Sequence, residues 1–431
     1  MIIVESLKIL VPTTVAPNLR NSLIDYVNLI SKELIKKTDV EILWFVYMNS
    51  KINSNDNTNI FDIHSFQNGL EFLNHSKPDL ILVNDYMQEP IHQSLIIAAK
   101  FLKIPIVAFY LYNISEDFAM TDTRNYFQKL LIKIKRTIRL SLMSKNIGES
   151  EKRLFSRVRF FMYKRTFLKK TIESIGKENM KILHNNSWKN QTNWISTLAD
   201  LHILSNDSWI EYLKRIGISE NKIVVTGNPI FDPLFKLPKQ DFKRKDKSKT
   251  FVLILTDSLY EHGFWSENER DSVLKSILIK LASQPDISFA LKIHPASEDI
   301  NYYKSLIGEL KINVPIYQKE FLFDLISDFD LVLTYGCSFA HVELGYLEKK
   351  MIFYDVNAPY PKLKIIDAGI KSGFIKVCTD IDDLIEIINE LQKYDDPVDE
   401  EFLKIREKIT FKSDANSSER ISSEFLNLLQ K

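Results

Sequence analysis

The polar residues that could do chemistry stand directly after apolar stretches of the sequence. FALKIHP ends in His294 and Pro295, LVLTYGCS contains Thr334 and Ser338, and the following FAHVELG carries Glu343. A histidine can donate a hydrogen bond to a phosphate oxygen and offset charge that develops on a leaving group. A hydroxyl at the start of a helix favours a phosphate, because the helix amides point at it. These residues predict a site for a phosphorylated ligand, and strand-end, helix-cap and solvated-helix roles are their structural alternatives.

A further polar loop follows the apolar run TFVLIL. This loop, LTDSLYEHGFW, contains Asp257, Glu261 and His262. If TFVLIL is a strand of the same parallel sheet, its loop lies at the same sheet edge as His294. We expect Asp257 to contact the phosphorylated ligand, and Glu261 and His262 to face a cleft between two domains, where they contact an acceptor.

The first half of the chain supplies the candidates for a catalytic base. Transfer onto a hydroxyl requires a group that takes the hydroxyl proton. Asp85, at the end of DLILVND, is the first choice, followed by Glu89 and His184, while capping of the next helix is the structural alternative for Asp85. The sequence has no HxH or HExxH pattern and no DxD in a suitable loop. We therefore expect a site without a metal ion and without a cofactor.

Strands and helices must alternate to place these loops together. LKILVP, VEILWFVYM, DLILVND and IPIVAFYLY are predicted strands, with helices over 18–36 and 90–102 between them. The pattern resumes with MKILHN, ADLHILSN and NKIVVTG, and then with TFVLIL, FALKI, LVLT, MIFY and FIKVC. Apolar strands that alternate with helices are typical of parallel sheets covered on both faces. The predicted fold class is α/β, with two doubly wound parallel sheets.

The length of the chain favours two domains. It has 431 residues, which is more than one hydrophobic core normally holds. The charged stretch PKQDFKRKDKSK lacks apolar periodicity and reads as a linker. We expect an N-terminal domain over residues 1–235, a C-terminal domain over 250–410, and a final helix in 411–431 that packs back on the N-terminal domain.

Cysteine usage and hydropathy indicate a cytoplasmic chain. Its two cysteines, Cys337 and Cys378, have neither metal-site nor disulfide spacing. The apolar N-terminal stretch is interrupted by Glu5 and Lys8, which predicts a first strand rather than a signal peptide. No uncharged apolar run approaches the roughly 18 residues that a membrane-spanning helix needs.

Positive charge is concentrated in one segment. Residues 124–181 contain 17 Lys and Arg but 4 Asp and Glu, whereas the whole chain has a net charge of +1. Two predicted helices within 113–180 carry this charge and interrupt the strand–helix alternation. The segment is either a helical insertion with a solvated basic surface, or a surface that lies against anionic lipid or an anionic acceptor. The second alternative predicts a peripheral position at the inner face of the plasma membrane. Nucleic acid is disfavoured, because no recognised nucleic-acid-binding fold surrounds the segment.

Residues 180–425 resemble a superfamily of surface-carbohydrate enzymes with the GT-B architecture, which has two Rossmann-like domains facing a cleft. Its members include UDP-N-acetylglucosamine 2-epimerases, CDP-glycerol glycerophosphotransferases, and CMP-sugar glycosyltransferases such as capsule sialyltransferases. His294 and Pro295 match the His-Pro motif of these proteins, and Ser338 and Glu343 match their serine turn and the acidic residue five positions on. ADLHILSNDSWIEYLKRIGISENKIVVTGNPIFD resembles the end of their N-terminal domain, and SDANSSERI resembles their closing DGxAxxRI motif. The resemblance implies that His294 and Ser338 hold a nucleotide phosphate and that Glu343 accepts from the ribose.

The sequence departs from each member's pattern. Epimerases have Ser-Gly-Gly in the turn and two adjacent glutamates, whereas this turn reads CSF and Glu343 is followed by Leu344. Paired glycines let backbone amides approach a diphosphate, so their loss argues against an epimerase. Glycerophosphotransferases often have Asp-Tyr-Ser-Ser and a His-Gly, whereas here the turn reads TYGCS and His184 precedes Asn185. Sialyltransferases usually hold the CMP phosphate with two adjacent hydroxyls, and here Cys337 takes one of those places.

The sequence therefore favours a metal-independent, inverting glycosyltransferase that builds cell-surface glycan. Its expected donor is a nucleotide-activated sugar, with a CMP-linked acidic sugar first, and its acceptor is a glycan or a lipid-linked glycan. The alternatives are a CDP-glycerol or polyol glycerophosphotransferase, an epimerase-like enzyme, and a scaffold protein that kept the fold without the chemistry.

Overall fold

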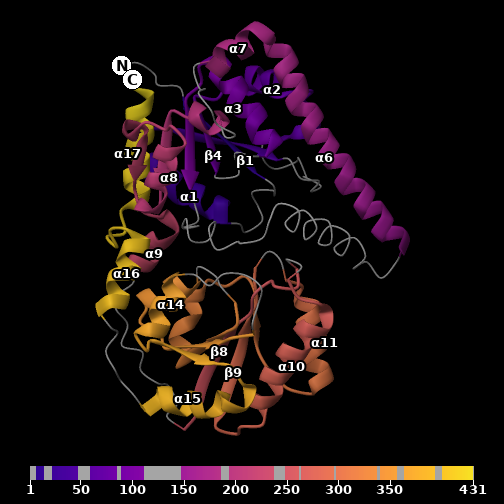
Figure 1. The fold of residues 1–431 in the computed structure, drawn as a ribbon, viewed down its shortest axis with the longest axis vertical. Coiled ribbons are helices and arrows are strands. Elements are labelled where there is room, and N and C mark those ends of the chain that lie inside the picture. The colour runs from indigo at the N-terminus through magenta and orange to yellow at the C-terminus, as the bar shows by residue number, and fades with distance from the viewer. Residues whose placement is uncertain are drawn as a thin grey trace. The chain divides into compact units, whose positions relative to one another are not determined.

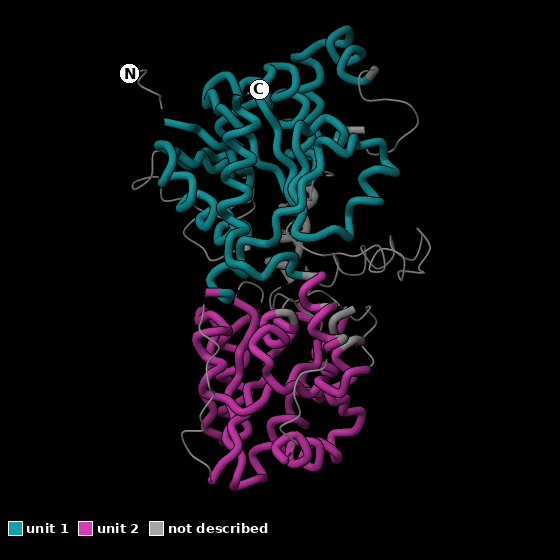
Figure 2. The backbone as a smooth tube through the Cα atoms, turned by 90° about the vertical axis from the view of Figure 1, so that its left-hand side faces the viewer, with its two compact units in different colours: residues 1–116, 152–235, 410–431 teal, residues 117–151, 236–409 magenta. Residues whose placement is uncertain are grey.

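The chain folds into two compact units in the computed structural model. The structure describes residues 6–13, 22–46, 59–84, 89–110, 147–185, 194–236, 248–261, 264–295, 298–336, 340–356, 364–393 and 400–430. Figure 2 distinguishes the two units by colour. The N-terminal unit holds the described residues up to Tyr110, from Lys152 to Phe235, and from Thr410 onward. The C-terminal unit holds the described residues from Lys236 to Ile409, together with residues 147–151 at the start of helix α6 (Ile147–Ile175).

The N-terminal unit is built on a parallel sheet of seven strands in the order β3-β2-β1-β4-β5-β6-β7. The strands are β1 (Leu7–Thr13), β2 (Val40–Val46), β3 (Ile60–Asp62), β4 (Leu80–Asn84), β5 (Ile106–Tyr110), β6 (Leu201–Leu204) and β7 (Ile223–Val225). The helices are α1 (Ser22–Leu34), α2 (Gly69–Ser76), α3 (Pro90–Leu102), α6 (Ile147–Ile175), α7 (Lys177–Asn185), α8 (Ile210–Arg215), α9 (Asp232–Phe235) and α17 (Ser417–Leu429).

Both faces of this sheet are buried, which explains its continuous apolar strands. Alternate strand residues point to opposite faces, so Leu10 and Ile81 pack in one core and Ile9 and Leu82 in the other. Helices α2 and α3 contribute to the first core, and α1 and α17 contribute to the second, as Figure 1 shows. A sheet covered in this way is the doubly wound arrangement that the sequence predicts.

The last helix of the chain is joined to the N-terminal unit by a buried carboxylate. Asp232 accepts hydrogen bonds from the amides of Ser417 and Ser418 at 3.1 and 2.8 Å, and from the Ser418 hydroxyl at 2.7 Å. The Arg420 side chain donates to the carbonyl of Thr226 at 2.7 Å. A carboxylate at the first residues of a helix satisfies amides that have no partner within the helix. These bonds hold α17 in place against α1.

The C-terminal unit is built on a parallel sheet of six strands in the order β10-β9-β8-β11-β12-β13. The strands are β8 (Thr250–Leu255), β9 (Ile287–Lys292), β10 (Ile316–Tyr317), β11 (Leu331–Thr334), β12 (Met351–Tyr354) and β13 (Ile375–Cys378). The helices are α10 (Glu267–Ala282), α11 (Ile300–Leu310), α12 (Leu322–Leu325), α13 (Ala340–Tyr346), α14 (Lys364–Lys371), α15 (Leu384–Lys393) and α16 (Glu400–Thr410). The fold class predicted from the sequence is confirmed in both units.

One predicted strand is wrong. The segment MKILHN, which ends near His184, is expected as a strand, but it lies in helix α7. Met180 and Leu183 pack against the core, while Ile182 is 58% exposed. Contacts three residues apart fit the 3.6-residue period of a helix, and the short apolar run did not distinguish this period from that of a strand.

Candidate functional site

The strand order of the C-terminal sheet places its topological switch point between β8 and β11. The chain leaves β8 toward β9 on one side and continues from β11 on the other side, so the connections diverge between these two strands. In open parallel sheets, ligands bind at this switch point, just beyond the carboxyl ends of the strands. The residues that follow the strands there are Asp257 after β8, His294 after β9 and Gly336 after β11.

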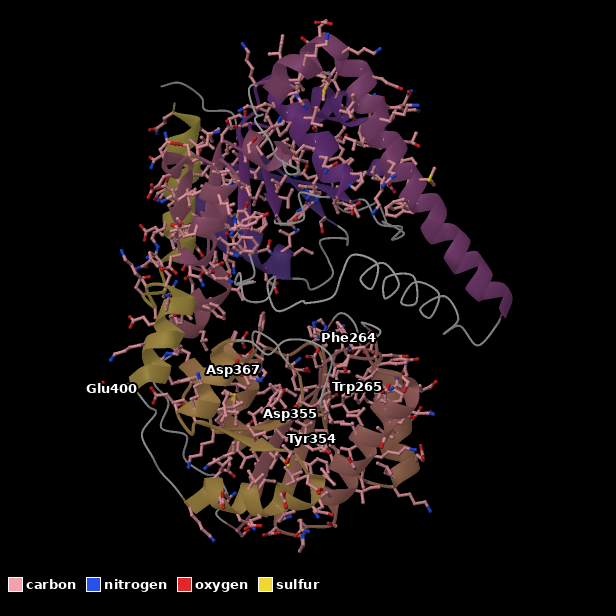
Figure 3. All side chains as sticks on the ribbon, viewed as in Figure 1. Phe264, Trp265, Tyr354, Asp355, Asp367 and Glu400 are labelled. Carbon is pink, nitrogen blue, oxygen red and sulfur yellow. The ribbon has the colours of Figure 1, made fainter. Side chains whose placement is uncertain are left out.

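Asp257 and Gly336 approach each other so closely that no side chain fits between them. A Cβ atom on Gly336 would lie 2.1 Å from the Asp257 Cβ and 2.0 Å from its carboxylate oxygen Oδ2. Tyr335, which is buried, hydrogen-bonds through its hydroxyl to the backbone of Asp257. The Tyr335 ring stacks on Trp265, with ring centroids 5.3 Å apart; Figure 3 labels Trp265. At the switch point, the backbone of the turn after β11 is therefore packed closely against the loop after β8, which carries the Asp257 carboxylate.

His294 lies at the exposed rim of the switch point. Its backbone amide donates to the carboxylate of Glu298, and Gln318 donates to the His294 carbonyl at 3.5 Å and to the Glu298 carbonyl at 2.9 Å. The imidazole and Pro295 are exposed, so the side chain is accessible while its backbone is held. The His294 imidazole can therefore donate a hydrogen bond to a ligand that binds from solution.

Glu298 is a site residue that the sequence analysis missed. It is 6% exposed, and its carboxylate accepts from the hydroxyls of Thr256 and Tyr303, each at 2.5 Å. Burial raises the pKa of Glu298 to about 7, the hydrogen bonds to its carboxylate oppose this rise, and the charge of Glu261 adds to it. The pair of acids in PASED is the signal in the sequence, but its second member, Asp299, caps helix α11.

Glu261 is a second carboxylate with a perturbed pKa at this edge. Burial raises its pKa, Asp257 contributes to the rise, and Arg270 opposes it. The guanidinium of Arg270 lies between the rings of Tyr260 and Tyr302, 4.1 and 3.5 Å from their centroids. A cation held in this way is a fixed positive charge beside the acidic group.

Thr334 and Glu343 lie on either side of the turn after β11. Thr334 is 3% exposed, and its hydroxyl accepts from the amide of Gly336 at 3.4 Å, so it shapes the turn. Glu343 lies in the first turn of α13 and is half-buried. Leu344, the next residue, is completely buried. Ser338, which the resemblance places on the phosphate, and His262 lie outside the described residues.

The candidates from the first half of the chain lie in the N-terminal unit. Asp85 follows β4 and lies outside the described residues. Glu89 precedes α3, and its carboxylate forms an ion pair with Lys164 of α6 at 2.5 Å. His184 is a half-buried residue near the end of α7, a helix that packs against α3. Asp257, Glu261, His294 and Thr334 thus gather at one edge of the C-terminal sheet, and Glu89 and His184 belong to the other unit.

A cavity of about 1130 Å³ lies at the opposite edge of the C-terminal sheet. It is lined by residues at the amino ends of strands, among them Phe251, Ile287 and Leu331. None of the site residues predicted from the sequence lines it. We place the functional site at the carboxyl edge, because the switch point and the residues with perturbed pKa values are there. Within the part of the chain that the structure describes, no three His, Cys, Asp or Glu side chains are arranged to hold a metal ion.

Comparison with known proteins identifies the fold. No protein-family model and no curated protein sequence matches the chain. Among solved structures, S. aureus MnaA in complex with UDP matches with a TM-score of 0.51 at 14% identity, over 99% of this chain and 98% of that one. The UDP-GlcNAc 2-epimerase of Neisseria meningitidis bound to UDP-GlcNAc matches with a TM-score of 0.52 at 15% identity, over 98% of this chain and 100% of that one.

Glycosyltransferases have the same fold. The spinosyn forosaminyltransferase SpnP matches with a TM-score of 0.50 at 12% identity, over 99% of this chain and 100% of that one. The chain therefore has the GT-B fold, as its resemblance to surface-carbohydrate enzymes implied. Its structural neighbours include both UDP-GlcNAc 2-epimerases and glycosyltransferases. At these identities the likeness defines the fold and leaves the reaction to be argued from the site.

Proposed function

We propose that the chain is a metal-independent, inverting glycosyltransferase whose donor is a CMP-linked acidic sugar and whose product is cell-surface glycan. The observation that carries the choice of a transferase over an epimerase is helix α13. The epimerase pattern has a second glutamate after Glu343, but here Leu344 is completely buried, so a carboxylate at that position would lie in the core. The paired glycines that suit a diphosphate are also missing from the turn after β11.

In the proposed reaction the switch point of the C-terminal unit binds the nucleotide. The exposed imidazole of His294 donates to a phosphate oxygen and offsets the charge that grows as the bond to the sugar breaks. Glu343 accepts from the ribose hydroxyls, and Ser338 holds the phosphate beside His294. The absence of a side chain on Gly336 lets the turn after β11 pack directly against Asp257, which sets the position of this turn.

The acceptor hydroxyl requires a base from the N-terminal unit in this scheme. Glu89 is already paired with Lys164, which gives it a structural task in holding α6. His184 lies near the end of a helix rather than at the end of a strand. We therefore assign the role of base to Asp85, which follows the buried strand β4.

A calorimetric titration of the full chain with CMP, CDP, UMP, UDP and GDP tests this proposal. Tighter binding of CMP than of the other nucleotides supports a CMP-sugar transferase. A preference for CDP would replace it with a glycerophosphotransferase or polyol phosphotransferase, in which His294 stabilises a phosphoryl transfer. A preference for UDP would replace it with an epimerase-like enzyme. Binding of none of the five would leave a scaffold protein as the better explanation.

We also propose that helix α6 places the enzyme on an anionic membrane surface, where a lipid-linked acceptor is available. The inner face of α6 packs on the N-terminal unit through Phe167 and Thr171, which are buried. Its outer face exposes Phe161 and Met162 to 46 and 57%, with the Arg165 guanidinium 4.8 Å from the Phe161 ring. Large apolar side chains among basic residues are typical of helices that lie in a membrane interface. No described helix is long and apolar enough to cross a membrane.

Sedimentation with vesicles tests the membrane proposal. Replacing Phe161 and Met162 by serine should release the protein from vesicles that contain phosphatidylserine, because it removes the apolar contribution to binding. Ile279→Ser is the matched control, since Ile279 is 55% exposed on α10 of the other unit. Equal sedimentation of the double variant and the control would contradict the proposal.

A further inference from the structure

His294 needs an anchor, because it stands beyond the last hydrogen bond of its sheet. The ladder ends at Ile293, whose amide donates to the carbonyl of Tyr317 at 2.9 Å. The next amide belongs to His294, and the residue after it, Pro295, has no amide. Beyond the ladder, side chains hold the His294 backbone: Gln318 donates to its carbonyl at a long 3.5 Å, and its amide donates to Glu298.

The anchor is the carboxylate of Glu298. One of its oxygens, Oε2, accepts from both the His294 amide and the Thr256 hydroxyl, and the other, Oε1, accepts from Tyr303. Thr256 follows β8, and Tyr303 is 1% exposed in α11. The carboxylate therefore ties the backbone of His294 to a second strand end and to a helix.

A buried carboxylate at position 298 destabilises the fold, which is unusual for a residue with a purely structural role. It is nine-tenths buried, and its hydrogen-bond partners among the described residues are the His294 amide and the hydroxyls of Thr256 and Tyr303, none of which is a cation. Burial of such a group without a cation is unfavourable, and an apolar or amide side chain would fill the space at lower cost. Two acceptor oxygens do, however, satisfy three donors at once, which a single amide oxygen cannot do.

We propose that Glu298 is the positioning residue for His294, and that it holds the histidine backbone so that the imidazole meets the phosphate of the bound nucleotide. The role rests on the proposed function, because it concerns the same nucleotide site. Glu298 itself does not touch the ligand in this arrangement. It acts through the bond to the His294 amide.

A double-mutant cycle in calorimetric titrations with CMP tests this role. Glu298→Ala should weaken CMP binding about tenfold, the loss expected for a hydrogen bond to a charged group. The variant that combines Glu298→Ala with His294→Ala should bind no more weakly than His294→Ala alone, because both changes remove the same contact. Glu298→Gln keeps an oxygen for the amide and should restore most of the affinity. Glu309→Ala, an exposed change in α11, is the matched control and should bind like the wild type.

Additive losses in the cycle, or unchanged CMP binding by Glu298→Ala, would overturn the proposal. The rate of hydrogen–deuterium exchange at the His294 amide can be measured without a ligand. This rate should be slow in the wild type and in Glu298→Gln, and fast in Glu298→Ala. If the wild type bound none of the nucleotides, the proposed function would fail by itself, and the exchange rate would still decide whether Glu298 holds His294. Equal exchange in all variants would overturn the role. If Glu298→Ala did not fold, Glu298→Met, which fills the space without a carboxylate, would supply the same comparison, and wild-type exchange and CMP binding in that variant would overturn the role.

Discussion

The buried carboxyl of Glu298 makes the stability of the C-terminal unit depend on pH, and replacing it with glutamine should remove that dependence. The pKa of Glu298 rises from 4.5 in the unfolded chain to about 7 in the folded chain, mainly through burial. A carboxyl with a raised folded pKa binds its proton more tightly in the native state. Ionisation of this carboxyl therefore lowers the free energy of unfolding. The loss is absent below the unfolded pKa, grows as the pH rises, and is complete above the folded pKa.

The size of the effect follows from these two pKa values. Between pH 5 and pH 8, a shift from 4.5 to about 7 lowers the free energy of unfolding by roughly 2–3 kcal/mol. Glutamine carries no charge at either pH and fills almost the same space. The free energy of unfolding of Glu298→Gln should therefore rise by roughly 2–3 kcal/mol relative to that of the wild type between these two pH values, whatever its absolute stability.

Tryptophan fluorescence during denaturation by urea can measure this gain. Trp265 is the sole tryptophan between residues 236 and 409, and it stacks on the buried Tyr335 beside the site. Comparing a variant with the wild type at each pH cancels the titration of groups elsewhere in the chain. Glu309→Gln, an exposed change in the same unit, should give a curve parallel to that of the wild type.

Parallel curves for Glu298→Gln and the wild type would refute the reasoning. They would mean that Glu298 is solvated in solution, or that its three donors offset the burial completely. A gain of the opposite sign would show that the carboxylate stabilises the folded chain when it is ionised.

The other predictions concern close contacts that the structure shows. Gly336→Ala should destabilise the C-terminal unit by about 1–3 kcal/mol and weaken nucleotide binding, because its Cβ would overlap Asp257. Gly308→Ala, where no atom lies within 4 Å of the added Cβ, is the control, and equal melting temperatures for the two variants would contradict the prediction. Asp232→Ala should release the amides of helix α17 and cost about 2–4 kcal/mol, which faster deuterium exchange in α17 would report. Unchanged exchange across Ser417 and Ser418 would show that the helix is held by its apolar face alone.

The sequence was sufficient to predict the fold because the strands are buried on both faces. Runs such as LKILVP and DLILVN are mainly apolar, and segments with helical periodicity separate them, which indicates a parallel doubly wound sheet without any tertiary information. Strand β3 was missed because its three residues, Ile60–Asp62, are half-buried and too short to show a period. Helix α7 was misassigned because its three apolar residues Met180, Ile182 and Leu183 fit either period.

Of the candidate site, only the residues that directly follow predicted strands could be predicted from the sequence. Asp257 and His294 stand within two residues of the ends of apolar runs, so their place at one sheet edge follows from the sequence alone. Glu298 could not be identified in the same way, because its partners Thr256 and Tyr303 come from a different strand end and a helix. The contact between Asp257 and Gly336 depends on β8 lying beside β11, which the order of elements in the chain does not give.

Calorimetric titration of the full chain with CMP, in the wild type and in His294→Ala, tests the central claim most directly. If the switch point of the C-terminal sheet binds a nucleotide phosphate through His294, the wild type should bind CMP and the variant should lose most of that affinity, with an unchanged circular dichroism spectrum. Equal affinity in the two proteins would show that the imidazole does not meet the phosphate, and would contradict the assignment of the site.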